Sequence, residues 1–156
     1  MRLMLLWILA AAISAVEVPV GEYVFDFDKT KMAINAELAD EMLNEMGATR
    51  GKYWEMMGMV MGEMRGSTVV LSKEGFSYGK AAERIAFTCS FKELDGVLVS
   101  DNVADPADVL MDDELENLGI SLGGNEVAVR GLDFPVVVFV RGKKAAPSKA
   151  TEPANP

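Results

Sequence analysis

The chain has 156 residues, of which 50% are hydrophobic and 25% are charged, and it contains no histidine. This length accommodates one compact domain. Its 15 basic and 24 acidic residues give a formal net charge of -9, which argues against binding to nucleic acids or anionic membrane surfaces because both would repel it. The lack of histidine excludes most catalytic triads and zinc sites.

Residues 1–15 have the composition of a secretory signal peptide. Arg2 precedes the apolar run 3–13, small residues follow, and cleavage is expected after Ala12 or Ala15. The run is shorter than the roughly 20 apolar residues that span a bilayer, and no cysteine stands at its end as a lipid attachment site. We therefore expect an exported protein, periplasmic or extracellular, with no transmembrane span after cleavage.

In residues 22–28 every second side chain is aromatic (Tyr23, Phe25 and Phe27) and the others are mostly acidic, which is the period of a β-strand with one buried face. The pattern predicts a first strand with Asp26 and Asp28 on its solvent face. The period then changes to that of two α-helices, over residues 30–46 and about 49–64, and Gly47 is expected to end the first. The predicted apolar stripes are Ile34, Leu38, Met42 and Met46 on the first helix, and Tyr53, Met57, Val60, Met61 and Met64 on the second.

The period of two returns after residue 66 and is interrupted by turn signals, among which Asp95-Gly96 is typical of a tight hairpin. Residues 101–117 are rich in acids and are expected to form a loop with one or two helical turns. A tail of residues 142–156, rich in Ala, Pro and Lys, is expected to be disordered. The predicted strands are residues 67–72, 76–79, 84–94, 97–100, 120–122, 126–130 and 135–141.

This element order predicts one α+β domain over residues 20–141. Consecutive hairpins make neighbouring strands antiparallel, so we expect a β meander that curls into a sheet or small half-barrel, with the helical segment after the first strand packed on it.

Three short segments resemble the small exported bacterial lipocalin-like domains, a largely uncharacterised group. They are Gly21 to Asp26 (GEYVFD) after the signal, Lys73 to Phe76 (KEGF) in a turn, and Val138 to Arg141 (VFVR) at the end of the last strand. The resemblance implies a small antiparallel barrel able to hold an apolar ligand, and it specifies no contact residues. True lipocalins usually have no long helical insert after the first strand.

Cys89 lies in the alternating segment 84–94 and is expected to be a buried thiol that packs as a small hydrophobic side chain. A single cysteine excludes an intramolecular disulfide. A catalytic thiol needs a neighbouring base, and the chain has no histidine to supply one.

The stretch from Val24 to Thr30 (VFDFDKT) resembles the D-x-D-x-T loop of haloacid-dehalogenase-type phosphatases. That resemblance implies Asp26 as nucleophile and Asp28 as acid/base beside Mg²⁺. The family's fold needs parallel strands joined by helices, whereas residues 67–141 carry hairpin turns. We therefore treat this Mg-dependent phosphatase as the alternative and expect no enzyme. Its later motifs would be Ser72, Lys80 and Asp112-Asp113.

A second alternative is Cu(I) binding, because soft thioethers select Cu(I). The methionines concerned lie beside Trp54 on the second predicted helix: Met56, Met57, Met59, Met61 and Met64. Methionines at helical spacing also fill gaps in protein cores, and packing is the interpretation that we favour.

The acidic residues between 101 and 117 are expected to be solvated surface, since their spacing lacks the D-x-[DN]-x-[DN]-G pattern of a calcium loop. The overall expectation is an exported non-catalytic domain without a cofactor. It would bind a small apolar ligand between helix and sheet, or a protein partner of the cell envelope. The expected ligand contacts are the inward apolar residues Phe25, Phe87, Met57 and Met61.

Overall fold

The computed structural model describes residues 16–131 and 134–142. The predicted signal peptide and residues 143–156 of the predicted tail lie outside this part of the chain. The described elements, in chain order, are β1 (Gly21–Phe25), α1 (Phe27–Glu37), α2 (Asp40–Glu45), α3 (Arg50–Glu63), β2 (Thr68–Leu71), β3 (Gly75–Gly79), β4 (Ile85–Leu94), β5 (Val97–Ala104), α4 (Asp112–Asn117), β6 (Gly119–Gly123), β7 (Glu126–Arg130) and β8 (Val137–Arg141).

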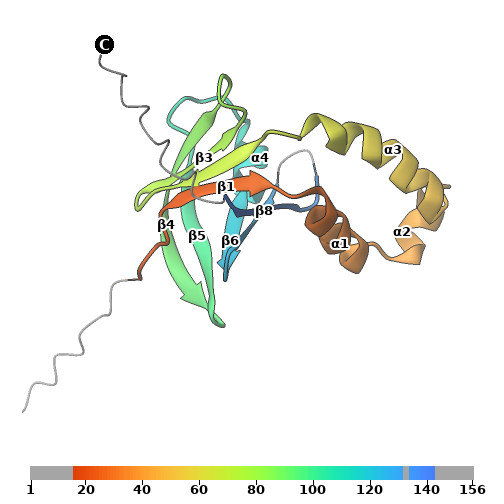
Figure 1. Cartoon of the computed structure of the whole chain (residues 1–156), viewed down its shortest axis with the longest axis horizontal. Helices are drawn as coiled ribbons and strands as arrows, with labels where there is room; N and C mark the ends of the chain where they lie inside the picture. Colours follow the sequence, from red (N-terminus) through yellow and green to blue (C-terminus); the bar gives the residue numbers. More distant parts are fainter. Residues whose placement is uncertain (1–15, 132–133, 143–156) are drawn as a thin grey trace, which may run out of the picture.

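The strands form a closed barrel in which each pairs antiparallel with its neighbours in the sequence (Figure 1). The expectation of an α+β domain with an antiparallel meander is confirmed. The expectation of a curled sheet or half-barrel is wrong, because β1 pairs with β8 and joins the two edges. Phe25 lies opposite Phe139, and Tyr23 lies opposite Arg141. Closure satisfies the backbone groups that an open edge would leave unpaired.

The barrel interior is filled by its own side chains. Tyr23, Val69, Val127 and Phe139 are fully buried and come from four different strands. An eight-stranded barrel has an interior just wide enough for side chains to fill it. The Phe139 ring makes edge-on contacts with Phe25 and Tyr78, at centroid distances of 6.1 and 5.8 Å.

The predicted hairpins are present, and the turn residues explain two of them. Asp95 and Gly96 both have positive φ, 51° and 81°, as a two-residue turn between β4 and β5 requires. At Gly75, which begins β3, a Cβ atom would lie 2.0 Å from the carbonyl oxygen of Phe87. Only glycine allows this close approach of β3 to β4.

The first strand is shorter than predicted, and a helix begins where its last residues were expected. β1 ends at Phe25, Asp26 is the N-cap of α1, and Asp28 lies in the first helical turn. The Asp26 carboxylate accepts a hydrogen bond of 2.9 Å from the backbone N–H of Lys29. This cap satisfies a helix donor and stops the strand, although the polar–apolar alternation continues through Asp28.

α1 packs on the outside of β8 and completes its pairing where β1 ends. The Asp26 N–H donates to the carbonyl of Val138 at 2.9 Å. The Val138 N–H in turn donates to the hydroxyl oxygen of the buried Thr30, also at 2.9 Å. Because both faces of β8 are covered, its apolar side chains follow one another without alternation.

The helix predicted over residues 30–46 is two helices, because the backbone is extended at Leu38 and Ala39. The break changes the direction of the apolar stripe. Ile34 and Leu38 are buried as predicted, whereas Met42 is half exposed and Leu43 is buried in its place. Gly47 follows with φ 64°, the left-handed conformation expected of a residue that ends a helix.

α3 matches the predicted second helix, with Thr49 as its N-cap and Met64 as its C-cap. Tyr53 and Met61 on the predicted stripe are buried, but Val60 is exposed. Figure 1 shows α1, α2 and α3 as an arch beside the barrel, which leaves it after β1 and returns to it at β2. We call these three helices the insert. None of the helices in residues 16–131 and 134–142 has the length and apolar character needed to cross a membrane.

Candidate functional site

The barrel has two ends with different chemistry. At one end, which we call the mouth, tight turns join β4 to β5 and β6 to β7. At the other end β1 leads into α1, and α3 leads into β2. Each end carries a cavity.

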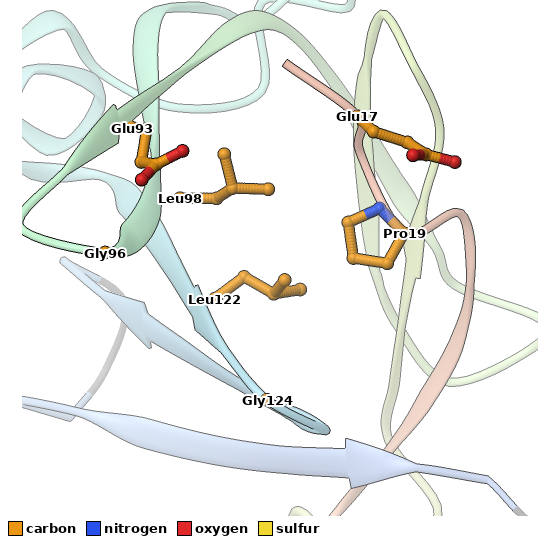
Figure 2. Close-up of a pocket in the computed structure, with 7 residues that line it drawn as sticks. All are labelled: Glu17, Pro19, Glu93, Gly96, Leu98, Leu122 and Gly124. Atoms are coloured by element: carbon orange, nitrogen blue, oxygen red, sulfur yellow. The ribbon is translucent and has the colours of Figure 1, made fainter.

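The cavity at the mouth, here the mouth pocket, has a volume of about 410 Å³. Figure 2 shows Leu98 and Leu122 side by side on the barrel, with Glu93 beyond them and Glu17 on the N-terminal segment opposite. The remaining lining residues are Pro19, Gly96 and Gly124. The mouth pocket therefore combines two exposed carboxylates with a small apolar floor.

The N-terminal wall of the mouth pocket is fastened to the barrel. The Tyr23 hydroxyl donates to the carbonyl of Pro19 at 3.2 Å. The Arg141 guanidinium donates to the carbonyl of Val20 at 3.0 Å and lies over the Tyr23 ring, 5.7 Å from its centroid. The first and last strands thus hold the segment that carries Glu17.

The second cavity, here the insert cavity, lies within the arch of helices and has a volume of about 240 Å³. Its walls are mostly apolar and come from all three helices of the insert and from the residue two positions before β8. The lining residues are Ile34, Glu37, Leu38, Met42, Met46, Tyr53 and Pro135.

Side-chain contacts between α1 and α3 hold the walls of the insert cavity apart at a fixed spacing. The Asn35 amide oxygen accepts hydrogen bonds from the Trp54 indole N–H at 2.8 Å and from Arg50 at 3.3 Å. Arg50 also donates to the carbonyl of Leu38 at 3.1 Å and to Asp40 at 2.9 Å. Arg50 therefore satisfies a free carbonyl at the end of α1 and holds the start of α2 beside it.

The one acid in the lining is already paired. Arg130 on β7 binds both carboxylate oxygens of Glu37, at 2.6 and 3.0 Å. This bidentate bond lowers the pKa of Glu37 below its ordinary value. Glu37 is therefore a fixed carboxylate that ties α1 to the barrel.

Tyr53 supplies the cavity with a polar group that the protein does not use. Burial raises the pKa of its phenol, so the hydroxyl is protonated at neutral pH. Its ring packs edge-on against Trp54 at 5.2 Å. Among the described residues the Tyr53 hydroxyl has no hydrogen-bond partner.

The four residues predicted as ligand contacts line neither the mouth pocket nor the insert cavity. Phe87 is buried against Phe76 inside the barrel, with ring centroids 5.2 Å apart. Met61 is fully buried, and Phe25 and Met57 are partly buried against the core. The structure places all four in or beside the packed core.

The phosphatase-like motif has a structural role in this fold. Asp26 caps α1, and Ser72 donates to the carbonyl of Gly75 within the β2–β3 hairpin at 3.2 Å. All strand pairs of the described barrel are antiparallel, whereas the phosphatase fold needs parallel ones. Within the part of the chain that the structure covers, no group of three acidic or thiol side chains is placed to hold a metal ion.

The methionines proposed for copper face different sides of α3. Met61 is fully buried, Met57 is partly buried, and Met56 and Met59 are exposed. The sulfur of Met64 accepts a hydrogen bond from the Tyr78 hydroxyl at 3.3 Å. The five methionines are therefore divided between the buried side of α3, which carries Met57, Met61 and Met64, and its exposed side, which carries Met56 and Met59.

The acidic loop after β5 uses its carboxylates to cap its own backbone. Asp105 accepts hydrogen bonds from the N–H groups of Leu110, Val109 and Ala107, at 2.8, 2.7 and 3.1 Å. These bonds, with that from Leu110 as the largest cause, lower the pKa of Asp105. Glu114 likewise accepts from the N–H of Met111. The prediction of a loop with one or two helical turns is confirmed by α4, although β5 reaches Ala104.

Cys89 is buried, as predicted, and burial raises the pKa of its thiol to about 11. At neutral pH it is a thiol with little thiolate, which is the form that packs and does not react.

The residues of the insert cavity carried a partial sequence signal. Ile34, Leu38 and Met42 were placed on one stripe and Tyr53 on another, but the break between α1 and α2 was missed. Asp40 and Glu41 indicated this break, because paired acids are typical of the first turn of a new helix.

Comparison of the chain with family models, with curated proteins and with solved structures found no match.

Proposed function

We propose that this chain is an exported, non-catalytic binding domain that holds a small, mostly apolar molecule in the insert cavity. The observation that carries the proposal is the cavity itself: an apolar space of about 240 Å³ between helices that polar side-chain bonds keep in place. Ligand sites in proteins are mostly apolar and contain a few placed polar groups.

The volume limits the size of the ligand. An apolar cavity of about 150 Å³ in another protein binds benzene, so about 240 Å³ suits a molecule with roughly two fused rings or a short branched chain. The Tyr53 hydroxyl, which has no hydrogen-bond partner among the described residues, would meet one polar group of the ligand. Glu37 offers no free charge, because Arg130 already neutralises it. The chemistry therefore favours an uncharged ligand over an ionic one.

The barrel supports a lipocalin-like assignment only at the level of architecture, since lipocalins are also eight-stranded up-and-down barrels. A ligand in the barrel interior is disfavoured because Tyr23, Phe139 and their neighbours already fill that space. The proposal therefore moves ligand binding from the barrel to the insert, the feature that typical lipocalins lack. Export rests on the signal-like composition of residues 1–15.

A matched pair of tryptophan substitutions tests the site. Met42 lines the insert cavity and is 50% exposed, whereas Met56 on α3 is 55% exposed and does not line it. Naphthol is the probe, an uncharged fused-ring molecule with one hydroxyl, and its binding is measured by isothermal titration calorimetry. Met42→Trp should weaken the binding by about tenfold or more because the indole fills the space. Met56→Trp should leave the affinity unchanged.

Equal loss in both variants, or none in either, would refute the insert cavity as the binding site, as would a protein that binds neither naphthol nor naphthalene. Binding that survives in Met42→Trp but is lost on replacing Leu98 with Trp would assign the ligand to the mouth pocket. Circular dichroism and the thermal midpoint of each variant show that the fold is intact.

A further inference from the structure

The methionines of the insert differ sharply in their access to solvent. Met42 and Met46 are 50% and 54% exposed, and both line the insert cavity. Met56 and Met59 are at least as exposed but lie on α3 away from it. Met61 is fully buried. A soluble oxidant can therefore reach the two sulfur-bearing side chains of the cavity wall without unfolding the protein.

We propose that Met42 and Met46 are oxidation sites, and that their conversion to methionine sulfoxide switches the insert cavity from ligand binding to ligand release. The proposal rests on the function proposed above. The oxidant is a peroxide or hypochlorous acid. With hydrogen peroxide, the thioether sulfur attacks one oxygen, the O–O bond breaks, an S–O bond forms, and proton transfer releases water. The sulfur is oxidised and the peroxide is reduced.

The change in the cavity wall follows from the chemistry of the product. A thioether is apolar and flexible, whereas a sulfoxide carries a strong hydrogen-bond acceptor that water solvates well. An apolar ligand seated against Met42 and Met46 would force both sulfoxide oxygens to give up water, while the side chains that line the cavity offer at most one donor in return, the Tyr53 hydroxyl. The free Tyr53 hydroxyl could satisfy one sulfoxide, but that would remove the polar contact available to the ligand.

The sequence separation of the pair adds a second reason. Met42 and Met46 are four residues apart across the end of α2, where Met46 is the C-cap, so their side chains lie on the same side of the helix. Their oxidation therefore adds two polar groups to one wall. Oxidation of the equally exposed Met56 and Met59 adds polarity on a surface that faces solvent already.

The test compares naphthol binding before and after limited treatment with hydrogen peroxide, with peptide mass mapping to locate each added oxygen. Because Met42 and Met46 line the cavity, the affinity of Met42→Leu/Met46→Leu is measured before treatment as that variant's own reference, and each protein is compared with its own untreated form. Peroxide should weaken binding to the wild-type protein by about tenfold or more. The double leucine variant should keep its affinity, whereas Met56→Leu/Met59→Leu should lose it as the wild type does.

The outcomes separate the two proposals. If the untreated protein binds no probe, the proposed function fails and the switch fails with it. If the untreated protein binds the probe and the oxidised protein binds it equally well, with oxygen mapped to Met42 and Met46, the switch alone is wrong. Equal peroxide sensitivity of the wild type and the Met42→Leu/Met46→Leu variant would also overturn it, since the loss would then come from other sites. Methionine sulfoxide reductase should restore binding in the wild type.

Discussion

The barrel and the insert treat their apolar residues in opposite ways. In the barrel, the alternation of side chains along each strand buries one face of the sheet, and closure leaves no strand edge unpaired. Among the described residues of the strands, the exposed large apolar side chains are Val24 and Leu94. The three helices of the insert and their caps expose six large apolar side chains, although the barrel has eight strands. These side chains are Met32, Met42, Met46, Met56, Met59 and Val60. The barrel buries nearly all of its large apolar side chains at least in part, whereas the insert leaves apolar surface and an apolar cavity accessible to other molecules.

The two regions also differ in what holds them. Backbone ladders join every strand of the barrel to its neighbours. The insert depends on side-chain contacts: Thr30 with β8, Glu37 with Arg130, and Asn35 with Trp54. Local opening of the insert is therefore expected to cost less free energy than opening of the barrel. A binding site whose ligand must enter and leave is expected in such a region.

The largest effect is expected from a methyl group added in the barrel wall, where β3 approaches β4. In Gly75→Ala the new Cβ would lie 2.0 Å from the Phe87 carbonyl oxygen and 2.9 Å from the Thr88 Cα, both backbone atoms that cannot rotate away. We expect the free energy of unfolding to fall by roughly 3 kcal/mol or more. The measurement is denaturation in urea.

The matched change in the insert should have the opposite sign. Gly51 lies in α3, and a Cβ atom added there would meet nothing within 4 Å. Gly51→Ala should therefore stabilise the protein by about 0.5–1 kcal/mol through helix propensity, measured by the same urea denaturation. A destabilisation by both substitutions, or by neither, would contradict the contrast between a closed barrel and an open insert.

Sequence reasoning succeeded where structure is local and failed where it depends on distant partners. The Asp95-Gly96 turn and the strands on either side of it were predictable, because φ preferences and a period of two act over a few residues. Barrel closure was not, because Phe25 and Phe139 meet only once the whole meander has curled. The start of α1 was missed for a related reason: Asp26 fits both an alternating strand and a helix cap.

The candidate site was less predictable than the fold. Met57 and Met61 are apolar and on the expected stripe, and that is why they pack into the core rather than line a cavity. The insert cavity arises from the break after Leu38, which turns Met42 away from the buried stripe. A cavity is a place where packing stops, and hydrophobic periodicity records only where packing is favoured.

An intermediate effect is expected at the joint between the two regions. Thr30→Val keeps the volume of the side chain but removes the oxygen that accepts the Val138 N–H, leaving a buried donor unpaired. The free energy of unfolding should fall by about 1–3 kcal/mol. Hydrogen exchange measured by NMR should show faster exchange of the Val138 amide.

Thr30→Ser is the control, because it retains the hydroxyl and loses only a methyl group. Its Val138 amide should stay protected even though the lost methyl costs about 1 kcal/mol. If the Val138 amide exchanges equally fast in both variants, the hydroxyl does not provide the bond that joins α1 to β8.

The smallest effect is expected from the ion pair that ties the end of α1 to β7, and it should depend on pH. Glu37 and Arg130 are both about half exposed, at 46% and 50%, so Glu37→Gln should cost only about 0.5 kcal/mol at pH 7. The pKa of Glu37 is lowered in the folded protein by its hydrogen bonds with Arg130. Its contribution is therefore fully present above the unfolded pKa of 4.5 and is lost as the pH falls through the lower folded value. Urea denaturation across this range should show wild type and Glu37→Gln converging in stability as the pH falls through the lowered pKa of Glu37.

The control for the ion pair is Glu55→Gln on α3. It removes an exposed charge without breaking an ion pair among the described residues, so it should leave the free energy of unfolding at pH 7 nearly unchanged. A constant difference between wild type and Glu37→Gln across this range would mean that packing of the Glu37 side chain, rather than its charge, joins α1 to the barrel. The insert would then be joined to β7 by side-chain packing, which is also what fills the barrel interior. The contrast between the two regions would be weaker at this contact.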